Sequence, residues 1–249
     1  MINVTITGAN GKMGHVISSI IAERDDCTVI SGIDLNTADN GKFPIVSEPA
    51  LLPQKPDVII DFSHPNNLDD ILSYALTNKT KLVIATTGYN DEQLTKIKEA
   101  AKQIPIFQSY NTSYGVQMVT KILRQVAKEF YQAGYDIEIL EKHHNQKIDA
   151  PSGTAKLLYE VMEEEIGETT AVTDRSSLHE KRKHEQIGIQ AMRGGTIFGE
   201  HTVMFAGIDE IIEIKHTALS KEVFVQGAIS AAYALIDKDN GLYTLKSLY

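Results

Sequence analysis

The fold is decided by the stretch INVTITGANGKMG, residues 2–14. Apolar and polar side chains alternate over residues 2–6 and the run stops at Gly8, which is typical of a strand that feeds a glycine turn. The three glycines then follow G-x-x-G-x-x-G, a variant of the dinucleotide-binding fingerprint. Glycine lets the backbone turn sharply toward a pyrophosphate, and the next helix points its first N–H groups at the negative charge. The residues expected to bind this phosphate are Gly8, Ala9, Asn10, Gly11, Lys12 and Met13.

The residues that follow complete a βαβ unit. Apolar residues at helical spacing predict a helix over residues 15–24, and residues 27–33 read as a second strand. Asp34 ends that strand 20 residues after Gly14, where a carboxylate can accept hydrogen bonds from an adenosine ribose. Leu35 follows, not an arginine that could hold a 2′-phosphate. The pattern therefore favours NADH over NADPH, although Lys42 could still reach a phosphate.

The alternation of strands and helices continues to about residue 110. Short apolar runs at 58–62, 82–85 and 106–107 predict strands, and residues 68–77 and 91–103 predict helices. Ligands of such sheets bind outside the carboxyl ends of the strands. Small polar residues there suit ribose and nicotinamide, although they could be plain turns. They are Ala85, Thr86, Thr87, Ser109, Tyr110, Asn111 and Thr112, and a third strand ends in Asp61-Phe62-Ser63.

The pattern changes after residue 110. We expect helices over residues 114–133 and 152–165, and strands over 136–142, 185–193, 199–206 and 209–217. The predicted class is α/β: a Rossmann-type doubly wound parallel sheet in residues 1–110, and a second α+β domain with a mixed sheet in residues 111–220. A helix over 221–236 is rich in small residues, and we expect the segment 221–249 to return to the first domain.

Composition bounds the partners. The net charge of −9 argues against a nucleic-acid or membrane partner, and we interpret the basic run at residues 179–184 as a solvated face. No window reaches the 18 or so apolar residues of a membrane span, and residues 1–8 lack the pattern of a signal peptide. Cys27 is the single cysteine, so no internal disulfide can form. We expect a cytoplasmic protein that needs no metal.

The most concentrated chemistry lies in EKHHNQKIDAPSGTA, residues 141–155. His143 and His144 follow a strand, so their side chains diverge. Lys147 comes next, ahead of a helix that Asp149 or Ser152 can cap. A helix N-terminus beside a lysine is suited to a carboxylate, and a histidine can transfer a proton near neutral pH. We interpret the cluster as a chemical centre.

These motifs resemble the 4-hydroxy-tetrahydrodipicolinate reductase (dihydrodipicolinate reductase) family of the lysine and diaminopimelate pathway, over essentially the whole length. The most specific match is HHxxKxDAPSGTA at residues 143–155. It is supported by the glycines of residues 8–14, by Asp61-Phe62-Ser63 and Thr86-Thr87-Gly88, and by Arg193-Gly194-Gly195 and Gly199-Glu200-His201-Thr202. The chain departs from the family at Ala85, where glycine is frequent, and at Thr112, where an aromatic residue near the nicotinamide is frequent.

The resemblance implies a function. It implies NADH- or NADPH-dependent reduction of a cyclic dicarboxylate with loss of water, and a second domain that binds substrate and builds a homotetramer. It implies that His143 is the proton donor and acceptor, that Lys147 is a proton donor, and that the substrate carboxylates bind His144, Gly153 and Thr154.

Two other interpretations stay open. The chain could be another two-domain dehydrogenase acting on an amino acid or a polyol, with a different acid and base. It could instead be a non-catalytic module that senses a dinucleotide.

Overall fold

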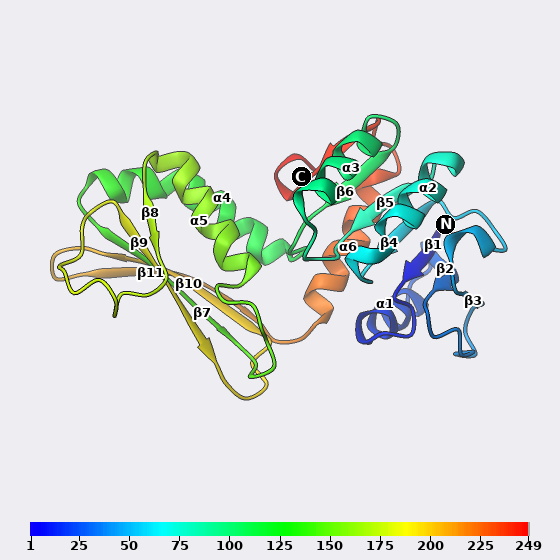
Figure 1. Cartoon of the computed structure of the whole chain (residues 1–249), viewed down its shortest axis with the longest axis horizontal. Coiled ribbons are helices and arrows are strands. Elements are labelled where there is room, and N and C mark those ends of the chain that lie inside the picture. The colour runs from blue at the N-terminus through cyan, green and yellow to red at the C-terminus, as the bar shows by residue number, and fades with distance from the viewer. Residues whose placement is uncertain (249) are drawn as a thin grey trace. The chain divides into compact units, whose positions relative to one another are not determined.

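A computed structural model describes residues 1–248 and divides the chain into two compact units (Figure 1). Residues 1–113 form the first unit together with the segment that starts at Lys221. Residues 114–220 form the second. The chain therefore passes from the first unit to the second and back.

The first unit contains a seven-stranded sheet in the order β12-β6-β5-β4-β1-β2-β3, in which every pairing is parallel. The chain adds β2 and β3 on one side of β1 and then returns to add β4 on the other side. In doubly wound folds, ligands bind at this switch point, in the crevice outside the carboxyl ends of the strands. The predicted Rossmann-type sheet is confirmed. The strands are β1 (Ile2–Thr7), β2 (Cys27–Ile33), β3 (Ile45–Val46), β4 (Val58–Asp61), β5 (Lys81–Ile84), β6 (Pro105–Gln108) and β12 (Gly241–Tyr243).

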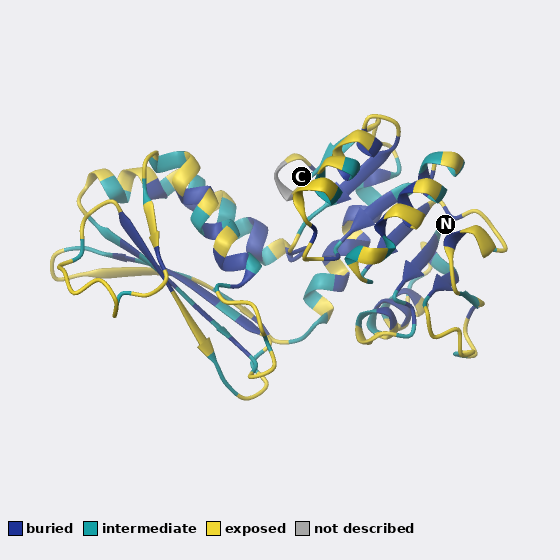
Figure 2. Cartoon of the chain, viewed as in Figure 1, coloured by how far each residue is buried: buried dark blue, intermediate teal, exposed yellow. Residues whose placement is uncertain are grey.

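Helices cover both faces of this sheet, because successive strand side chains alternate between two cores. Ile60 and Val83 belong to the core that includes α1 (Lys12–Ala22) and α6 (Glu222–Leu235). Their neighbours Ile59 and Leu82 belong to the core beneath α2 (Leu68–Asn78) and α3 (Asp91–Ala101). Figure 2 shows the resulting pattern of buried strands and helices with exposed outer faces. The short helices of this unit are η1 (Pro49–Leu51), η2 (Pro65–Asn67) and α7 (Leu245–Leu248).

Three differences from the sequence prediction have local causes. Helix α1 begins at Lys12, three residues before the predicted start, because its first turn is glycine-rich and carries no apolar period. Strands β3 and β12 span two and three residues, too few for an alternating pattern. The residues after the helix predicted over 221–236, for which no further element is predicted, pair through β12 with β6, along the edge of the sheet.

The second unit contains a five-stranded sheet in the order β11-β10-β7-β9-β8. Strand β7 runs antiparallel to β10 and parallel to β9, so the predicted mixed sheet is confirmed. The strands are β7 (Asp136–His143), β8 (Thr170–Val172), β9 (Gln186–Arg193), β10 (Gly199–Ala206) and β11 (Ile211–Ala218). Strand β8 has three residues and was not predicted.

Helices α4 (Tyr114–Gln132) and α5 (Gly153–Ile166) pack on one face of that sheet. Alternate residues of β7 turn to this face, starting with Ile137 and Ile139 and continuing with Glu141 and His143. The covered face is therefore apolar at one end and polar at the other. The polar end carries Glu141 and His143, which belong to the motif at residues 141–155.

Most of the basic run at residues 179–184 is exposed, as expected for a solvated face, and Arg182 is the exception. Arg182 is partly buried and pairs with Asp136 at 2.5 Å and Glu138 at 3.1 Å. His184 stacks on Tyr131 with ring centroids 4.1 Å apart. These residues therefore close the end of the second unit's sheet by ion pairing and stacking.

Residues 1–248 include no helix that combines the length and the apolar character needed to cross a bilayer.

Candidate active site

The turn after β1 requires glycine at two positions. Gly8 has φ +70°, and a Cβ there would lie 2.9 Å from the carbonyl oxygen of Phe62. A Cβ on Gly14 would lie 2.3 Å from the oxygen of Gly8, because the first turn of α1 packs directly on the loop. The close approach of helix and turn is the geometry that a dinucleotide-binding turn needs.

The hydrogen bonds of this turn show which of its N–H groups already have a partner. The N–H groups of Gly8 and Ala9 both donate to the oxygen of Ile33, at 2.8 and 3.3 Å. In the described part of the chain no side chain caps α1, because its N-cap is Gly11. A helix whose first N–H groups lack a cap is a ready anion site. The N–H groups of Gly8 and Ala9 are thus engaged, whereas no side chain caps the first turn of α1, at Lys12 and Met13.

Asp34 is held in place at the end of β2. Its Oδ2 accepts the N–H of Asn10 and its Oδ1 accepts the N–H of Asn36, both at 2.9 Å. A cavity of about 200 Å³ opens beside it, between the ends of β1 and β2 and the loops that follow β3 and β4. Its lining carries two acidic side chains, Asp34 and Asp70, and contains neither lysine nor arginine.

The remaining predicted cofactor residues follow β5 and β6, so all of them lie at the carboxyl edge of the sheet. Residues 85–87 come directly after β5, and residues 109–112 directly after β6. Ser109 donates through Oγ to the oxygen of Asn111 at 2.6 Å, which tightens the second turn. Thr112 differs from its neighbours, because it is 2% exposed and its hydroxyl donates to the oxygen of Phe224 on α6 at 2.5 Å. Its side chain therefore anchors α6.

Sequence reasoning did not single out Asp61 as a functional residue, although it quoted the motif. The carboxylate is 1% exposed and accepts hydrogen bonds from the hydroxyls of Thr7, Ser63 and Tyr89. Burial, and then the charge of Asp61, raise the pKa of Tyr89 above its ordinary value, so its phenol stays a donor. Asp61 thereby ties together the turns after β1, β4 and β5.

In the second unit, strand register assembles the polar cluster. Glu141 of β7 pairs with His201 of β10, and His143 of β7 pairs with Arg193 of β9. Partners in register share one face of a sheet, so these four side chains lie on the face that α4 and α5 cover.

Glu141 is the centre of this cluster. Its side chain is fully buried, and Arg193 donates to both carboxylate oxygens at 2.8 Å. His143 Nδ1 lies 2.6 Å from Oε2, and the N–H of Ser152 donates to Oε1 at 3.0 Å. Burial alone would raise the pKa of Glu141, but these hydrogen bonds outweigh it and hold the pKa at about 2. Glu141 is therefore ionised.

The site residues predicted between positions 143 and 154 lie at the end of β7, in the loop after it and at the start of α5. His143 ends β7 and is 8% exposed. Lys147 Nζ lies 2.7 Å from Asp149 Oδ1, and its N–H donates to the oxygen of His144 at 3.2 Å. Gly153 and Thr154 are the first two residues of α5, whose N-cap Ser152 accepts the N–H of Ala155 at 3.2 Å. The structure thus brings His143, Lys147 and a helix N-terminus to one end of one unit.

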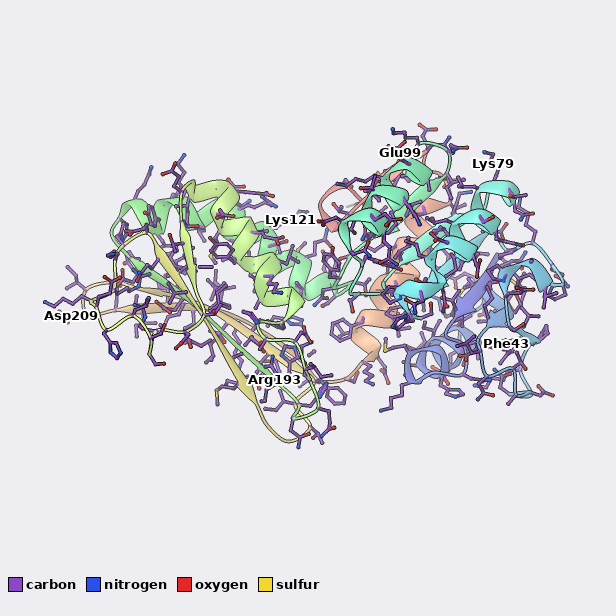
Figure 3. The ribbon with its side chains drawn as sticks, viewed as in Figure 1. Phe43, Lys79, Glu99, Lys121, Arg193 and Asp209 are labelled. Carbon is purple, nitrogen blue, oxygen red and sulfur yellow. The ribbon has the colours of Figure 1, made fainter. Side chains whose placement is uncertain are left out.

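Three residues of the cluster were quoted only within motifs of the sequence, not as functional candidates: Glu141, Arg193 (labelled in Figure 3) and His201. Glu141 could have been found, because it precedes His143 by two residues on a predicted strand and so shares its face. Arg193 and His201 lie on other strands, and only the register brings them near. His201 Nε2 lies 2.9 Å from Ser152 Oγ. Burial, followed by the charge of His143, lowers the pKa of His201 to about 3, so its ring stays neutral.

Known proteins resemble the chain along its whole length. A family model described as dihydrodipicolinate reductase, N-terminus, matches residues 2–112, and one described as dihydrodipicolinate reductase, C-terminus, matches residues 115–248. A 4-hydroxy-tetrahydrodipicolinate reductase from Exiguobacterium sibiricum is 49% identical over 96% of this chain and 93% of its own. One from Clostridium novyi is 45% identical over 98% and 97%.

A solved structure also shares the fold. The dipicolinate-bound dihydrodipicolinate reductase from Paenisporosarcina sp. TG-14 has a TM-score of 0.79 and 24% identity, with 98% of this chain and 97% of that chain covered.

Proposed function

Because the chain belongs to the dihydrodipicolinate reductase family, we propose that it reduces 4-hydroxy-tetrahydrodipicolinate to tetrahydrodipicolinate with loss of water, in lysine and diaminopimelate biosynthesis. Its cofactor is a nicotinamide dinucleotide. The observation that supports the chemistry most directly is the β7 register, which places His143 beside an ionised carboxylate and next to the N-terminus of α5.

The first unit fits the dinucleotide. We assign the pyrophosphate to the residues of the β1–α1 turn, above all Lys12 and Met13, since the first turn of α1 has no side-chain cap. The residues after β5 and β6 would hold the nicotinamide half. The role of Thr112 falls to its backbone, because its hydroxyl is engaged by α6. When bound, the cofactor supplies a hydride.

We propose a preference for NADH over NADPH. Two backbone N–H groups fix the Asp34 carboxylate, and the neighbouring cavity has no cationic lysine or arginine in its lining. An adenosine ribose can donate to this carboxylate, whereas a 2′-phosphate would meet like charge from Asp34 and Asp70.

The second unit fits the cyclic dicarboxylate. Gly153 and Thr154 would hold one carboxylate at the positive end of α5, and Lys147 and His144 would bind the other charges. Loss of the hydroxyl leaves a conjugated ring imine. His143 would provide the proton that compensates the added hydride, and Lys147 is the second donor.

The test is oxidation of NADH followed by absorbance, with the ring substrate generated in situ from pyruvate and aspartate semialdehyde. His143→Gln and Lys147→Ala are each expected to lower kcat by about 10²–10⁴-fold, since each removes a proton donor. His184→Gln, which removes a histidine of the same unit stacked on Tyr131, serves as the matched control. NADH binding should be unchanged in all three variants.

Repeating the assay with NADPH tests the cofactor preference, and a kcat/KM higher with NADPH than with NADH would refute it. If folded wild-type protein binds NADH yet oxidises none with this substrate, the substrate assignment is wrong. Turnover of an amino acid or a polyol would then favour another dehydrogenase.

We further propose a homotetramer that works in the cytoplasm, where the reduced dinucleotide pool of biosynthesis is found. Within residues 114–220, all of which are described, α4 and α5 are the only helices and both pack on one face of the sheet. The opposite face is left to associate with further copies of the chain.

A further inference from the structure

The carboxylate of Glu141, on β7, is held by several hydrogen bonds. It is fully buried and accepts four hydrogen bonds, of which two come from Arg193, one from His143 and one from the N–H of Ser152. An ionised carboxylate offers about four acceptor positions, so its capacity is filled. Its negative charge is balanced by one guanidinium, and its remaining strong contact is to the ring that we assign to proton transfer.

Building on the proposed role of His143, we infer that Glu141 and Arg193 are positioning residues for the reaction. Glu141 fixes the tautomer of His143 and stabilises its protonated ring, and Arg193 keeps Glu141 ionised and in place. The same carboxylate anchors the start of α5, so it sets the proton donor and the carboxylate-binding helix end relative to each other.

The tautomer follows from the contact. An ionised carboxylate only accepts hydrogen bonds, so Nδ1 of His143 must carry the proton that it shares with Glu141 at 2.6 Å. Nε2 is then the nitrogen that exchanges a proton with substrate. When the protonated ring acts, the Nε2–H bond breaks, its electron pair stays on Nε2, and the proton passes to the ring system that received the hydride. The Nδ1–H remains with Glu141.

The chain leaves room around Nε2. A Cβ on Gly199 would lie 3.1 Å from this atom, closer than most side chains tolerate. The absence of a side chain at Gly199 therefore keeps that nitrogen from being covered by β10.

Arg193 extends the arrangement to the loop between β7 and α5. One terminal nitrogen donates both to Glu141 at 2.8 Å and to the oxygen of Asp149 at 2.6 Å. The Ser152 N–H reaches Glu141 from the end of the same loop. The segment that carries Lys147 and leads into Gly153 is therefore fastened to Glu141 and Arg193 near its end.

The charged groups around His143 are few. Glu141 lies on its own strand, Arg193 comes from β9, and the ring of His201 comes from β10 with its centroid 5.1 Å away. Lys147 lies in the following loop and is paired with Asp149. Because the His201 ring is neutral, the stabilising charge that acts on a protonated His143 is that of Glu141.

Glu141→Gln tests the inference, because it keeps the shape, removes the charge and offers an N–H to Nδ1, which favours the wrong tautomer. We expect kcat to fall by about 10²–10⁴-fold, with the KM for NADH unchanged. The pH profile of kcat/KM should change, since the ring loses its anionic partner. Glu141→Asp, which restores the charge, should recover part of the loss.

Glu164→Gln is the matched control, since Glu164 lies in the same unit and also pairs with an arginine, Arg124, but near the C-terminal end of α5. It should leave kcat and the pH profile unchanged. Arg193→Lys, which keeps the positive charge but loses the two-pronged contact, is a second probe if Glu141→Gln does not fold. It should also lower kcat, and it should weaken dipicolinate binding.

A double variant separates this inference from the proposed function. If Glu141 acts through His143, Glu141→Gln should have no further effect on kcat in a His143→Gln background. A full additional loss in that background, or a wild-type kcat and pH profile in Glu141→Gln, would overturn the positioning role while His143 keeps its own. Full turnover by His143→Gln alone would instead remove the proposed proton donor, and the inference with it.

Discussion

Two buried carboxylates, one in each unit, organise the polar groups of the two candidate sites. Asp61 gathers the hydroxyls of Thr7, Ser63 and Tyr89 at the nucleotide end, and Glu141 gathers a guanidinium, an imidazole and a backbone N–H at the other. Each is fully satisfied by donors, which is the condition under which a buried charge is tolerated. Function at this scale depends on side chains that need not touch a ligand.

At the same scale, His201 leads to a prediction about how the stability of the protein depends on pH. Its pKa is about 3 in the folded protein and 6.5 when unperturbed, because burial disfavours the charged ring. A depressed folded pKa contributes stability that is complete above pH 6.5 and is lost as pH falls toward 3. Between pH 7.5 and 5.0 this group alone should cost the wild type about 2 kcal/mol of unfolding free energy.

His201→Gln should lose less stability over that interval, because glutamine does not titrate yet can still bond Ser152 Oγ. The measurement is urea unfolding followed by circular dichroism at both pH values. His184→Gln, at an exposed histidine, is the control and should follow the wild type. Equal losses in wild type and His201→Gln would show that His201 is protonated in the folded protein.

At the scale of elements, the sequence predicted what is periodic and missed what depends on pairing. The alternation of β7 identified a strand ending near His143, and the motif before α5 marked a helix N-terminus. The contact of Glu141 with Arg193 depends on the parallel register of β7 and β9, which lie about 50 residues apart in the chain. The contact of Thr112 with Phe224 could not be predicted for a similar reason, since the two residues lie 112 positions apart in the chain.

The β1–α1 turn supports a prediction at the same scale. Gly14→Ala should gain up to ~1 kcal/mol from helix propensity. Its Cβ would lie 2.3 Å from the oxygen of Gly8 and 2.4 Å from that of Ala9, however, and overpacking typically costs about 1–3 kcal/mol. The clash should win, so the melting temperature falls. NADH should bind at least about 10-fold more weakly as the turn is displaced, which is ~1.4 kcal/mol.

Gly241→Ala is the control for that variant, because its Cβ would meet no atom closer than 3.4 Å in the same unit. Calorimetric titration with NADH measures the affinity of both variants, and thermal unfolding measures their melting temperatures. Unaltered NADH affinity in Gly14→Ala would mean that the turn is not part of the cofactor site.

At the scale of the whole molecule, the proposed tetramer assigns a role to the uncovered face of the second unit's sheet. Leu140 and Met192 lie on this face with Lys142, which pairs with Glu200, and Lys215 joins the same carboxylate at 2.7 Å. The face is therefore neither purely apolar nor dominated by one sign of charge. Two copies related by symmetry could bury it with part of its charge already paired within each chain.

Met192→Glu tests this face. The side chain is 54% exposed in the single chain, so the protomer should fold normally, but burying a glutamate between copies costs more in desolvation than pairing with Lys142, its neighbour on β7, would recover. Light scattering should give four times 27.5 kDa for the wild type and a smaller particle for the variant. Leu51→Glu, at a 55% exposed position of the first unit, should keep the wild-type mass. A wild-type mass of 27.5 kDa would contradict the tetramer, and an undiminished mass in Met192→Glu would place the interface elsewhere.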